Sequence, residues 1–211
     1  MPNFIVGLDL GSRSIKAVIG EVRRSELFIH HAFKMPSSGF RRGVIDDMGE
    51  ATQAVSPVIA ELRKISKQAI SNIYLGVGGS DIRVQPSVGV VAVSRADYEI
   101  YQDDVNRAIQ SAQAINLPNN RMILHAVVRE YVVDGVKDIP NPLEMVGNRL
   151  EVNSLIIDAF APGVKNLSHC IEVLGGNVRG LVLGLLADAR AVLSKNQKEL
   201  GVAVIDIGFG K

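Results

Sequence analysis

Apolar and polar positions alternate along this 211-residue chain in runs that predict a mixed α/β fold. Three apolar segments near the start, FIVGLDL, IKAVIGEV and LFIHHAFKM, predict three consecutive strands. The first turn falls at Gly11–Ser14. Asp46 and Asp47 can cap a following helix. Its apolar positions recur at three- and four-residue spacing and form one face: Val55, Val58, Ile59, Leu62 and Ile65.

The middle of the chain predicts a small separate unit, which we place at residues 84–161. It begins with the strand SVGVVAVS and continues with a helix that Asp103 and Asp104 can cap. Two long strands follow, RMILHAVVREYVVDG and RLEVNSLIIDAFA, joined by a loop with two prolines. The expected order is therefore strand, helix, strand, strand.

The last third of the chain returns to alternating helices and strands. Pro162 suits the first turn of a helix that Gly175–Gly176 ends. The segments VRGLVLG, ADARAVLSKNQ and GVAVIDIG then predict a strand, a helix and a final strand. Such alternation predicts a sheet with parallel pairs, covered by helices. We expect residues 1–83 and 162–211 to form one discontinuous domain.

Composition narrows the class of protein. The hydrophobic fraction is 47%, with 5% aromatic residues and no Trp, so the core must be mainly aliphatic. A net charge of +1 does not favour a nucleic-acid partner. The single cysteine, Cys170, excludes an internal disulfide and suits a reducing cytosol. The longest apolar run, GLVLGLLA, is far shorter than the roughly 20 residues that cross a bilayer, and there is no basic leader. We therefore expect a soluble, cytoplasmic chain.

Two Asp–Gly turns carry the candidate chemistry. The first lies in VGLDLGSRSIKAVIGE and the second in VAVIDIGFGK, at the other end of the chain. A glycine-rich turn lets backbone N–H groups approach a phosphate closely. Hydroxyl groups and a lysine add donors in the first turn. Its candidate phosphate-binding residues are Gly11, Ser12, Arg13, Ser14 and Lys16.

An aspartate stands at the predicted strand end before each turn. Asp9 is placed to meet a hydrated Mg²⁺ rather than the anionic phosphate, and Asp206 has the same relation to Gly208 and Gly210. Two such turns facing each other would hold the phosphates of one nucleotide. The alternative is that each is a structural turn, because Asp-x-Gly after a strand is common. The spacing matches neither G-x-x-x-x-G-K-[ST] nor G-x-G-x-x-G.

These motifs resemble those of known proteins. The hairpin D-x-G-S-x-x-x-K, with a second D-x-G-x-G near residue 200, resembles the actin-like ATPase superfamily. Three segments, GFRRGVIDDMGEATQAV, NPLEMVGNRLEV and KELGVAVIDIG, resemble FtsA, a family of bacterial cell-division proteins. The chain departs from the family at Leu143–Glu144, and at Phe209–Lys211, where Gly-Gly-Thr-Thr is usual. The resemblance covers almost the whole chain.

The resemblance implies a fold and ligands. It implies an actin-like, ribonuclease H-like subdomain 1A, made of residues 1–83 and 162–211. An SHS2-like strand-helix-strand-strand subdomain 1C, residues 84–161, is inserted into it. ATP and Mg²⁺ are the implied ligands. The chain would be the N-terminal half of a protein that polymerises into filaments and anchors the FtsZ ring. That protein would meet other divisome proteins through subdomain 1C. A C-terminal helix would hold it on the cytoplasmic face of the inner membrane at the septum.

The resemblance also bears on catalysis. Many FtsA-like sequences read L-E-P-L-A after the VRGLVLG-type strand, whereas Gly184 replaces the acid here. Hydrolysis depends on orienting a water against the γ-phosphate, so we expect at most slow turnover and assign no catalytic residue. Asp188, one turn on, is the alternative acid. Two other functions stay open: a PilM-like cytoplasmic scaffold of type IV pilus assembly, and an actin-superfamily kinase acting on a small molecule.

Overall fold

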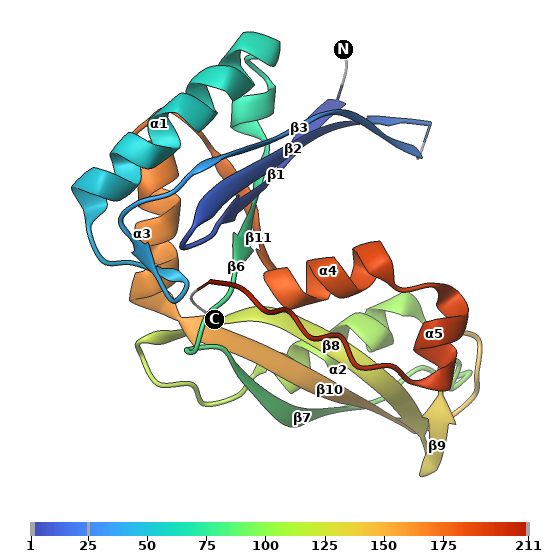
Figure 1. Cartoon of the computed structure of the whole chain (residues 1–211). Helices are drawn as coiled ribbons and strands as arrows, with labels where there is room; N and C mark the ends of the chain where they lie inside the picture. Colours follow the sequence, from blue (N-terminus) through green and yellow to red (C-terminus); the bar gives the residue numbers. More distant parts are fainter. Residues whose placement is uncertain (1–2, 25, 210–211) are drawn as a thin grey trace. The chain divides into compact units, whose positions relative to one another are not determined.

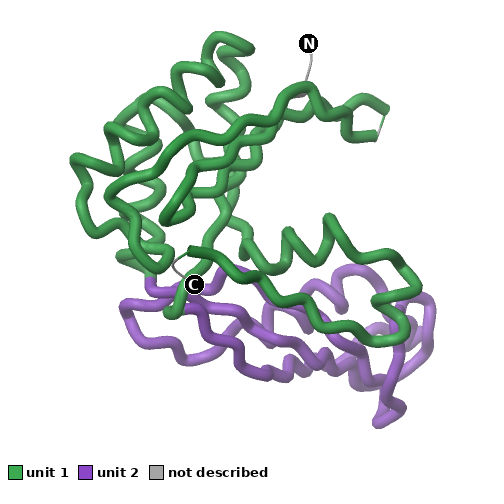
Figure 2. Tube along the Cα trace, viewed as in Figure 1, with its two compact units in different colours: residues 1–81, 161–211 green, residues 82–160 purple. Residues whose placement is uncertain are grey.

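A computed structural model describes residues 3–24 and 26–209, and the chain divides into two compact units (Figure 2). Residues 1–81 and 161–211 form the split unit, and residues 82–160 form the inserted unit. The boundaries expected from the sequence, after residues 83 and 161, lie close to these. Each unit has its own cluster of buried apolar side chains.

The split unit is built on a five-stranded sheet with the strand order β11-β6-β1-β2-β3 (Figure 1). Strands β1 (Asn3–Leu10), β2 (Ser14–Arg23) and β3 (Glu26–Pro36) form an antiparallel meander. Strand β6 (Ile73–Val77) runs parallel to β1, and β11 (Val178–Leu183) runs parallel to β6. Both the meander and the parallel pairs were predicted from the sequence.

Two helices bury their apolar faces against this sheet. Helix α1 (Met48–Ile65) begins after Asp47, whose carboxylate accepts the N–H of Glu50 at 2.9 Å, as the capping pattern predicted. Helix α3 (Ala161–Glu172) lies beside α1 (Figure 1). The 3₁₀ turn η1 (Ala69–Ser71) leads into β6.

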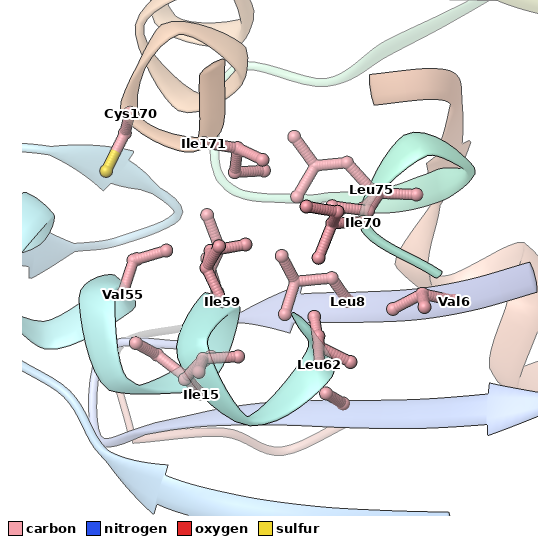
Figure 3. Close-up of a cluster of buried hydrophobic side chains, with 14 of the residues drawn as sticks. Val6, Leu8, Ile15, Val55, Ile59, Leu62, Ile70, Leu75, Cys170 and Ile171 are labelled. Carbon is pink, nitrogen blue, oxygen red and sulfur yellow. The ribbon is translucent and has the colours of Figure 1, made fainter. Parts of the chain in front are cut away.

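The core between helices and sheet is aliphatic, as the composition predicted. Figure 3 shows Ile59 of α1 and Ile171 of α3 pointing toward strand residues such as Leu8 and Leu75, and all four are at most 2% exposed. Burying such a side chain stabilises the fold by about 1.5–3 kcal/mol. Cys170 belongs to the same cluster, and burial raises the pKa of its thiol. The cysteine therefore acts as a small apolar side chain.

Beyond β11 the structure departs from the sequence prediction of one helix. Two short helices, α4 (Gly184–Val192) and α5 (Lys195–Leu200), replace it. Ser194 separates them, because its hydroxyl accepts the N–H of Gln197 at 3.3 Å and caps α5. Within the described residues, no helix is both long enough and apolar enough to span a membrane.

The prediction that GVAVIDIG forms a final strand is wrong. Residues 201–209 have no regular secondary structure, and most of their side chains are exposed. A strand exists only where a neighbouring backbone completes its hydrogen bonds. In the described part of the chain, no strand pairs with this segment.

The inserted unit is a four-stranded antiparallel sheet, ordered β7-β10-β8-β9, with one helix packed against it. Its elements are β7 (Arg83–Ala92), α2 (Gln102–Gln113), β8 (Arg121–Val133), β9 (Val136–Ile139) and β10 (Arg149–Phe160). The predicted order of strand, helix, strand, strand is present. The predicted proline-bearing loop adds the short strand β9.

The start of α2 differs from the sequence prediction. Tyr101 is the N-cap, and Asp104 lies inside the first turn, where its carboxylate accepts the Tyr101 N–H at 3.0 Å. Asp103 and Asp104 are therefore not the cap. Burial alone would raise the pKa of Asp104, but the Tyr101 N–H and the paired Arg107 guanidinium outweigh it and lower that pKa.

Candidate phosphate and cation site

The first Asp–Gly turn is a tight hairpin between β1 and β2. The Gly11 N–H donates to the Ser14 carbonyl at 3.2 Å and closes the turn. A Cβ atom added at Gly11 would lie 2.8 Å from that carbonyl oxygen, closer than real Cβ contacts. Glycine is therefore required here by the close approach of the backbone within the turn, and phosphate binding by this turn stays a prediction.

Asp9 and Lys16 lie directly opposite each other at the mouth of this turn. The Lys16 ammonium is 3.1 Å from Oδ2 of Asp9, and the two side chains are 58% and 47% exposed. The sequence analysis assigned Asp9 to a cation and Lys16 to a phosphate. In the structure the two side chains pair with each other.

The other candidate donors of the turn differ in exposure. Arg13 is exposed, Ser12 is half-buried and Ser14 is buried. The Arg13 carbonyl accepts the Ser37 N–H at 3.3 Å, which ties the turn to the end of β3. Arg13 and Ser12 are therefore more open to a ligand than Ser14.

The second Asp–Gly turn is only partly described. Asp206 and Gly208 lie exposed in the irregular segment, and Gly210 lies outside the described residues. The Arg13 guanidinium lies 6.0 Å from the centroid of the Phe209 ring, a cation–π distance. In the described part of the chain, no hydrogen bond or ion pair joins Asp206 to the first turn. The pairing of the two aspartates around one cation stays a prediction.

A glycine that the sequence analysis did not assign to the site lies beside the first turn. Gly76 in β6 is the lateral neighbour of Asp9, and a Cβ added there would lie 3.9 Å from Oδ1 of Asp9. Gly184 follows β11, where an added Cβ would make ordinary contact with Val77. The carboxyl ends of β1, β6 and β11 meet at one edge of the sheet, the edge where α/β folds bind ligands. The signal in the sequence was the run GVGG, residues 76–79, which begins inside β6.

The segment GFRRGVIDD packs against this same edge. Strands β4 (Phe40–Arg41) and β5 (Val44–Ile45) form its hairpin. Gly43, with φ +84°, touches the turn after β6, since an added Cβ would lie 2.2 Å from the Gly78 carbonyl oxygen. Gly39, with φ +74°, accepts the Asp46 N–H at 3.0 Å. The two glycines of this motif therefore serve backbone packing next to the candidate site.

The segment NPLEMVGNRLEV has a structural role in the inserted unit. The Met145 carbonyl accepts the Ile100 N–H at 2.9 Å, and the Gly147 N–H donates to the Tyr98 carbonyl at 2.9 Å. These contacts fasten the connection before β10 to the connection before α2. The motif therefore helps to build the inserted unit.

The described residues contain no group of three or more His, Cys, Asp or Glu side chains able to hold a metal ion. A cation at Asp9 would therefore depend on one carboxylate, water and ligand oxygens. That donor set suits Mg²⁺, which keeps several waters and binds through one or two carboxylates and phosphates.

The fold of the chain is actin-like. A solved structure of a PilM–PilN type IV pilus biogenesis complex matches 88% of this chain and 49% of its own chain, with a TM-score of 0.58. At 14% identity this likeness shows the fold alone. Residues 79–158 match the family described as the SHS2 domain inserted in FtsA. The inserted unit therefore corresponds to subdomain 1C, as the resemblance implied.

Curated relatives show a similarity in sequence as well as in fold. The chain is 38% identical over 209 residues to cell division protein FtsA of Borreliella burgdorferi, covering 99% of this chain and 51% of that protein. It is 34% identical to FtsA of Bacillus subtilis, covering 97% of this chain and 47% of that protein. It is 30% identical to FtsA of Escherichia coli K12, covering 98% of this chain and 49% of that protein. The chain spans about half the length of these relatives. The chain is thus related along nearly its whole length to FtsA, and the resemblance seen in its motifs is confirmed.

Proposed function

We propose that this chain forms one side of an ATP–Mg²⁺ site in an FtsA-like cell-division protein. The observation that carries the proposal is the Asp9–Gly11–Lys16 hairpin at the sheet edge of a chain related to FtsA. Gly11, Ser12, Arg13, Ser14 and Lys16 face the phosphates, and Asp9 holds the hydrated cation. Gly208, Gly210 and Asp206 supply the second phosphate turn.

In a protein of the relatives' length, the nucleotide acts mainly as an assembly ligand. It stabilises a closed state because it binds that state more tightly. That protein polymerises, recruits FtsZ and attaches through a C-terminal helix to the cytoplasmic face of the inner membrane at the septum. Other divisome proteins contact subdomain 1C.

Co-sedimentation tests this function directly. A protein of the relatives' length is mixed with FtsZ from the same organism and with liposomes, with and without ATP. We expect FtsZ to pellet with the liposomes only when this protein is present. Failure to recruit FtsZ under every condition would contradict the proposal.

The 211-residue chain by itself should bind nucleotide weakly, since one side of the cleft contributes only part of the contacts. Isothermal titration with ATP and Mg²⁺ should give an affinity weaker than micromolar. A sub-micromolar affinity would show that one side of the cleft is sufficient for tight nucleotide binding.

Hydrolysis should be slow, because Gly184 stands where an acid would orient the water. A Cβ at Gly184 makes only ordinary contact, so Gly184→Glu should fold normally and raise phosphate release in the full-length protein. If Asp188→Asn abolishes phosphate release instead, Asp188 is the acid. Phosphorylation of a small acceptor would favour the kinase alternative.

The second candidate is a PilM-like scaffold, which the fold likeness favours. The sequence relation supports FtsA instead, with identities up to 38% against 14% for the PilM complex. Binding of an FtsZ tail peptide by a protein of the relatives' length would favour FtsA over the pilus scaffold.

A further inference from the structure

The second Asp–Gly turn carries a phenyl ring where the first carries a hydroxyl group. When DLGS, residues 9–12, is aligned with DIGF, residues 206–209, Phe209 takes the place of Ser12. A hydroxyl group can donate a hydrogen bond to a phosphate oxygen, whereas the face of a phenyl ring carries partial negative charge and repels an anion. Phe209 therefore brings no side-chain donor to this turn, and its ring attracts a cation instead.

The cation that the Phe209 ring meets is Arg13 of the first turn. The central carbon of the Arg13 guanidinium lies 6.0 Å from the ring centroid, at the outer limit of a cation–π contact. Within residues 3–24 and 26–209, the Arg13 guanidinium makes no hydrogen bond and no ion pair. The structure thus directs toward a ring of the same chain a charge that the sequence offers to a phosphate.

This contact also ties a segment with few other attachments to the hairpin. Residues 201–209 have no partner among the described strands, and Phe209 is 78% exposed. Exposed cation–π contacts are weak, and the loss of one changes an equilibrium constant by about two- to fivefold. An anion that binds Arg13 more strongly can therefore release the ring.

We propose that the ring of Phe209 is an autoinhibitory partner of Arg13, which a phosphate ligand displaces when it binds the guanidinium. The inference rests on the proposed function, because it takes Arg13 as a residue that faces the phosphates. An Arg–phosphate pair forms charge-assisted hydrogen bonds, which are stronger than an exposed cation–π contact, so the ligand wins this competition. Release of the ring also detaches the second turn from the first.

Fluorine NMR tests the contact in the chain labelled with 4-fluorophenylalanine, where Phe209→Leu assigns the Phe209 signal. Arg13→Gln removes the cation and should move this signal toward the position of a solvated ring. Sodium tripolyphosphate, added to the unsubstituted chain, should move the signal in the same direction. Sodium chloride at equal ionic strength should move it less. An Arg13→Gln variant with an unchanged Phe209 signal would overturn the contact and the proposal with it.

Phe28 is a matched control within the same chain. The Arg23 guanidinium lies 5.9 Å from the centroid of its ring, but neither residue belongs to an Asp–Gly turn. The Phe28 signal, assigned with Phe28→Leu, should stay in place when tripolyphosphate is added. Equal movement of the Phe28 and Phe209 signals would mean that the anion binds exposed arginines in general, which contradicts a specific role of Phe209.

The inhibition itself is measured by the affinity for ATP with Mg²⁺. Phe209→Leu keeps an apolar side chain but removes the ring, so Arg13 is available without first breaking a contact. This variant should bind ATP about two- to fivefold more tightly than the unsubstituted chain, by isothermal titration. Phe28→Leu should bind ATP as the unsubstituted chain does. Equal affinities of Phe209→Leu and the unsubstituted chain would show that the ring does not inhibit.

The outcomes separate this inference from the proposed function. If tripolyphosphate moves the Phe209 signal but neither the unsubstituted chain nor Phe209→Leu binds ATP, the displacement by phosphate stands and the nucleotide site is wrong. If ATP binds while neither ATP nor tripolyphosphate moves the Phe209 signal, the displacement is wrong and the nucleotide site stands.

Discussion

Arg121 and Asp158 form a buried ion pair that joins β8 to β10 in the inserted unit. Their side chains are only 6% and 1% exposed, and the Arg121 guanidinium also donates to the Asp158 carbonyl at 3.1 Å. Removing the carboxylate takes away the negative charge that lies against this buried guanidinium. Asp158→Ala should therefore lower the free energy of unfolding by about 3–5 kcal/mol, measured by urea denaturation.

Glu61→Ala is the control for Asp158→Ala. It breaks the Lys64–Glu61 pair on α1, whose side chains are 70% and 43% exposed. Exposed pairs of this kind contribute about 0–1 kcal/mol. Equal losses from the two substitutions would show that burial does not set the strength of the Arg121–Asp158 pair.

Asp134 makes stability depend on pH. Its carboxylate accepts the backbone N–H groups of Asn148 at 3.0 Å and Arg149 at 2.9 Å, and the bond from Asn148 is the main reason that its pKa is lowered. A carboxyl whose pKa is lower in the folded state stabilises the protein fully above its unfolded pKa of about 4. That contribution is lost as the pH falls through the folded pKa.

Urea denaturation, repeated at intervals of about one pH unit between pH 6 and pH 2.5, measures this loss of stability. Asp134→Asn should be less stable than wild type at pH 6, and the difference should shrink at the acidic end. Asp188→Asn, which removes an exposed carboxylate from α4, should stay close to wild type throughout. A difference for Asp134→Asn that does not change with pH would contradict the assignment.

At the scale of elements, the β4–β5 hairpin depends on the backbone of Gly43. Its φ of +84° disfavours any side chain, and an added Cβ would also clash with the Gly78 carbonyl. Gly135, in the β8–β9 turn, has a similar φ of +89° but open space around it. Gly135→Ala should cost about 1–2 kcal/mol from backbone strain alone, and Gly43→Ala should cost more.

Thermal unfolding of the two variants checks this difference. Because only Gly43 meets another backbone, the excess loss measures the contact between the hairpin and the turn after β6. Equal losses would mean that this contact adds nothing and that conformation explains both glycines.

At the scale of the whole molecule, the inserted unit is built to fold independently. Its first and last strands are paired, with Arg83 opposite Asp158, so both ends of the unit lie together. It has its own buried cluster around Leu150 and Val152. Residues 82–160 expressed alone should unfold cooperatively, with a stability on the order of 5 kcal/mol. A dispersed NMR spectrum and a single urea transition would support this, and a collapsed spectrum would contradict it.

Local patterns predicted much of this architecture. The meander β1–β3, the parallel strands, the Asp47 cap and the apolar face of α1 were all readable from spacing. These features depend on contacts within about one turn or one strand, where periodicity is a reliable guide. The predicted N-cap of α2 was wrong, because the buried Asp104 lies in the first turn and its carboxylate accepts the Tyr101 N–H. A sequence pattern cannot distinguish an aspartate in this position from an aspartate at the N-cap.

The sequence by itself determined the alternation of strands and helices, the two Asp–Gly turns and the relation to FtsA. Tertiary structure decided which of these segments meet. It paired Asp9 with Lys16, brought Gly76 beside the same carboxylate and left GVAVIDIG without a partner strand. The physical reason is the separation along the sequence over which each kind of interaction acts. Periodicity and turn chemistry act between residues that are near in sequence, whereas an ion pair, a glycine contact or a strand pairing depends on which distant backbone lies alongside.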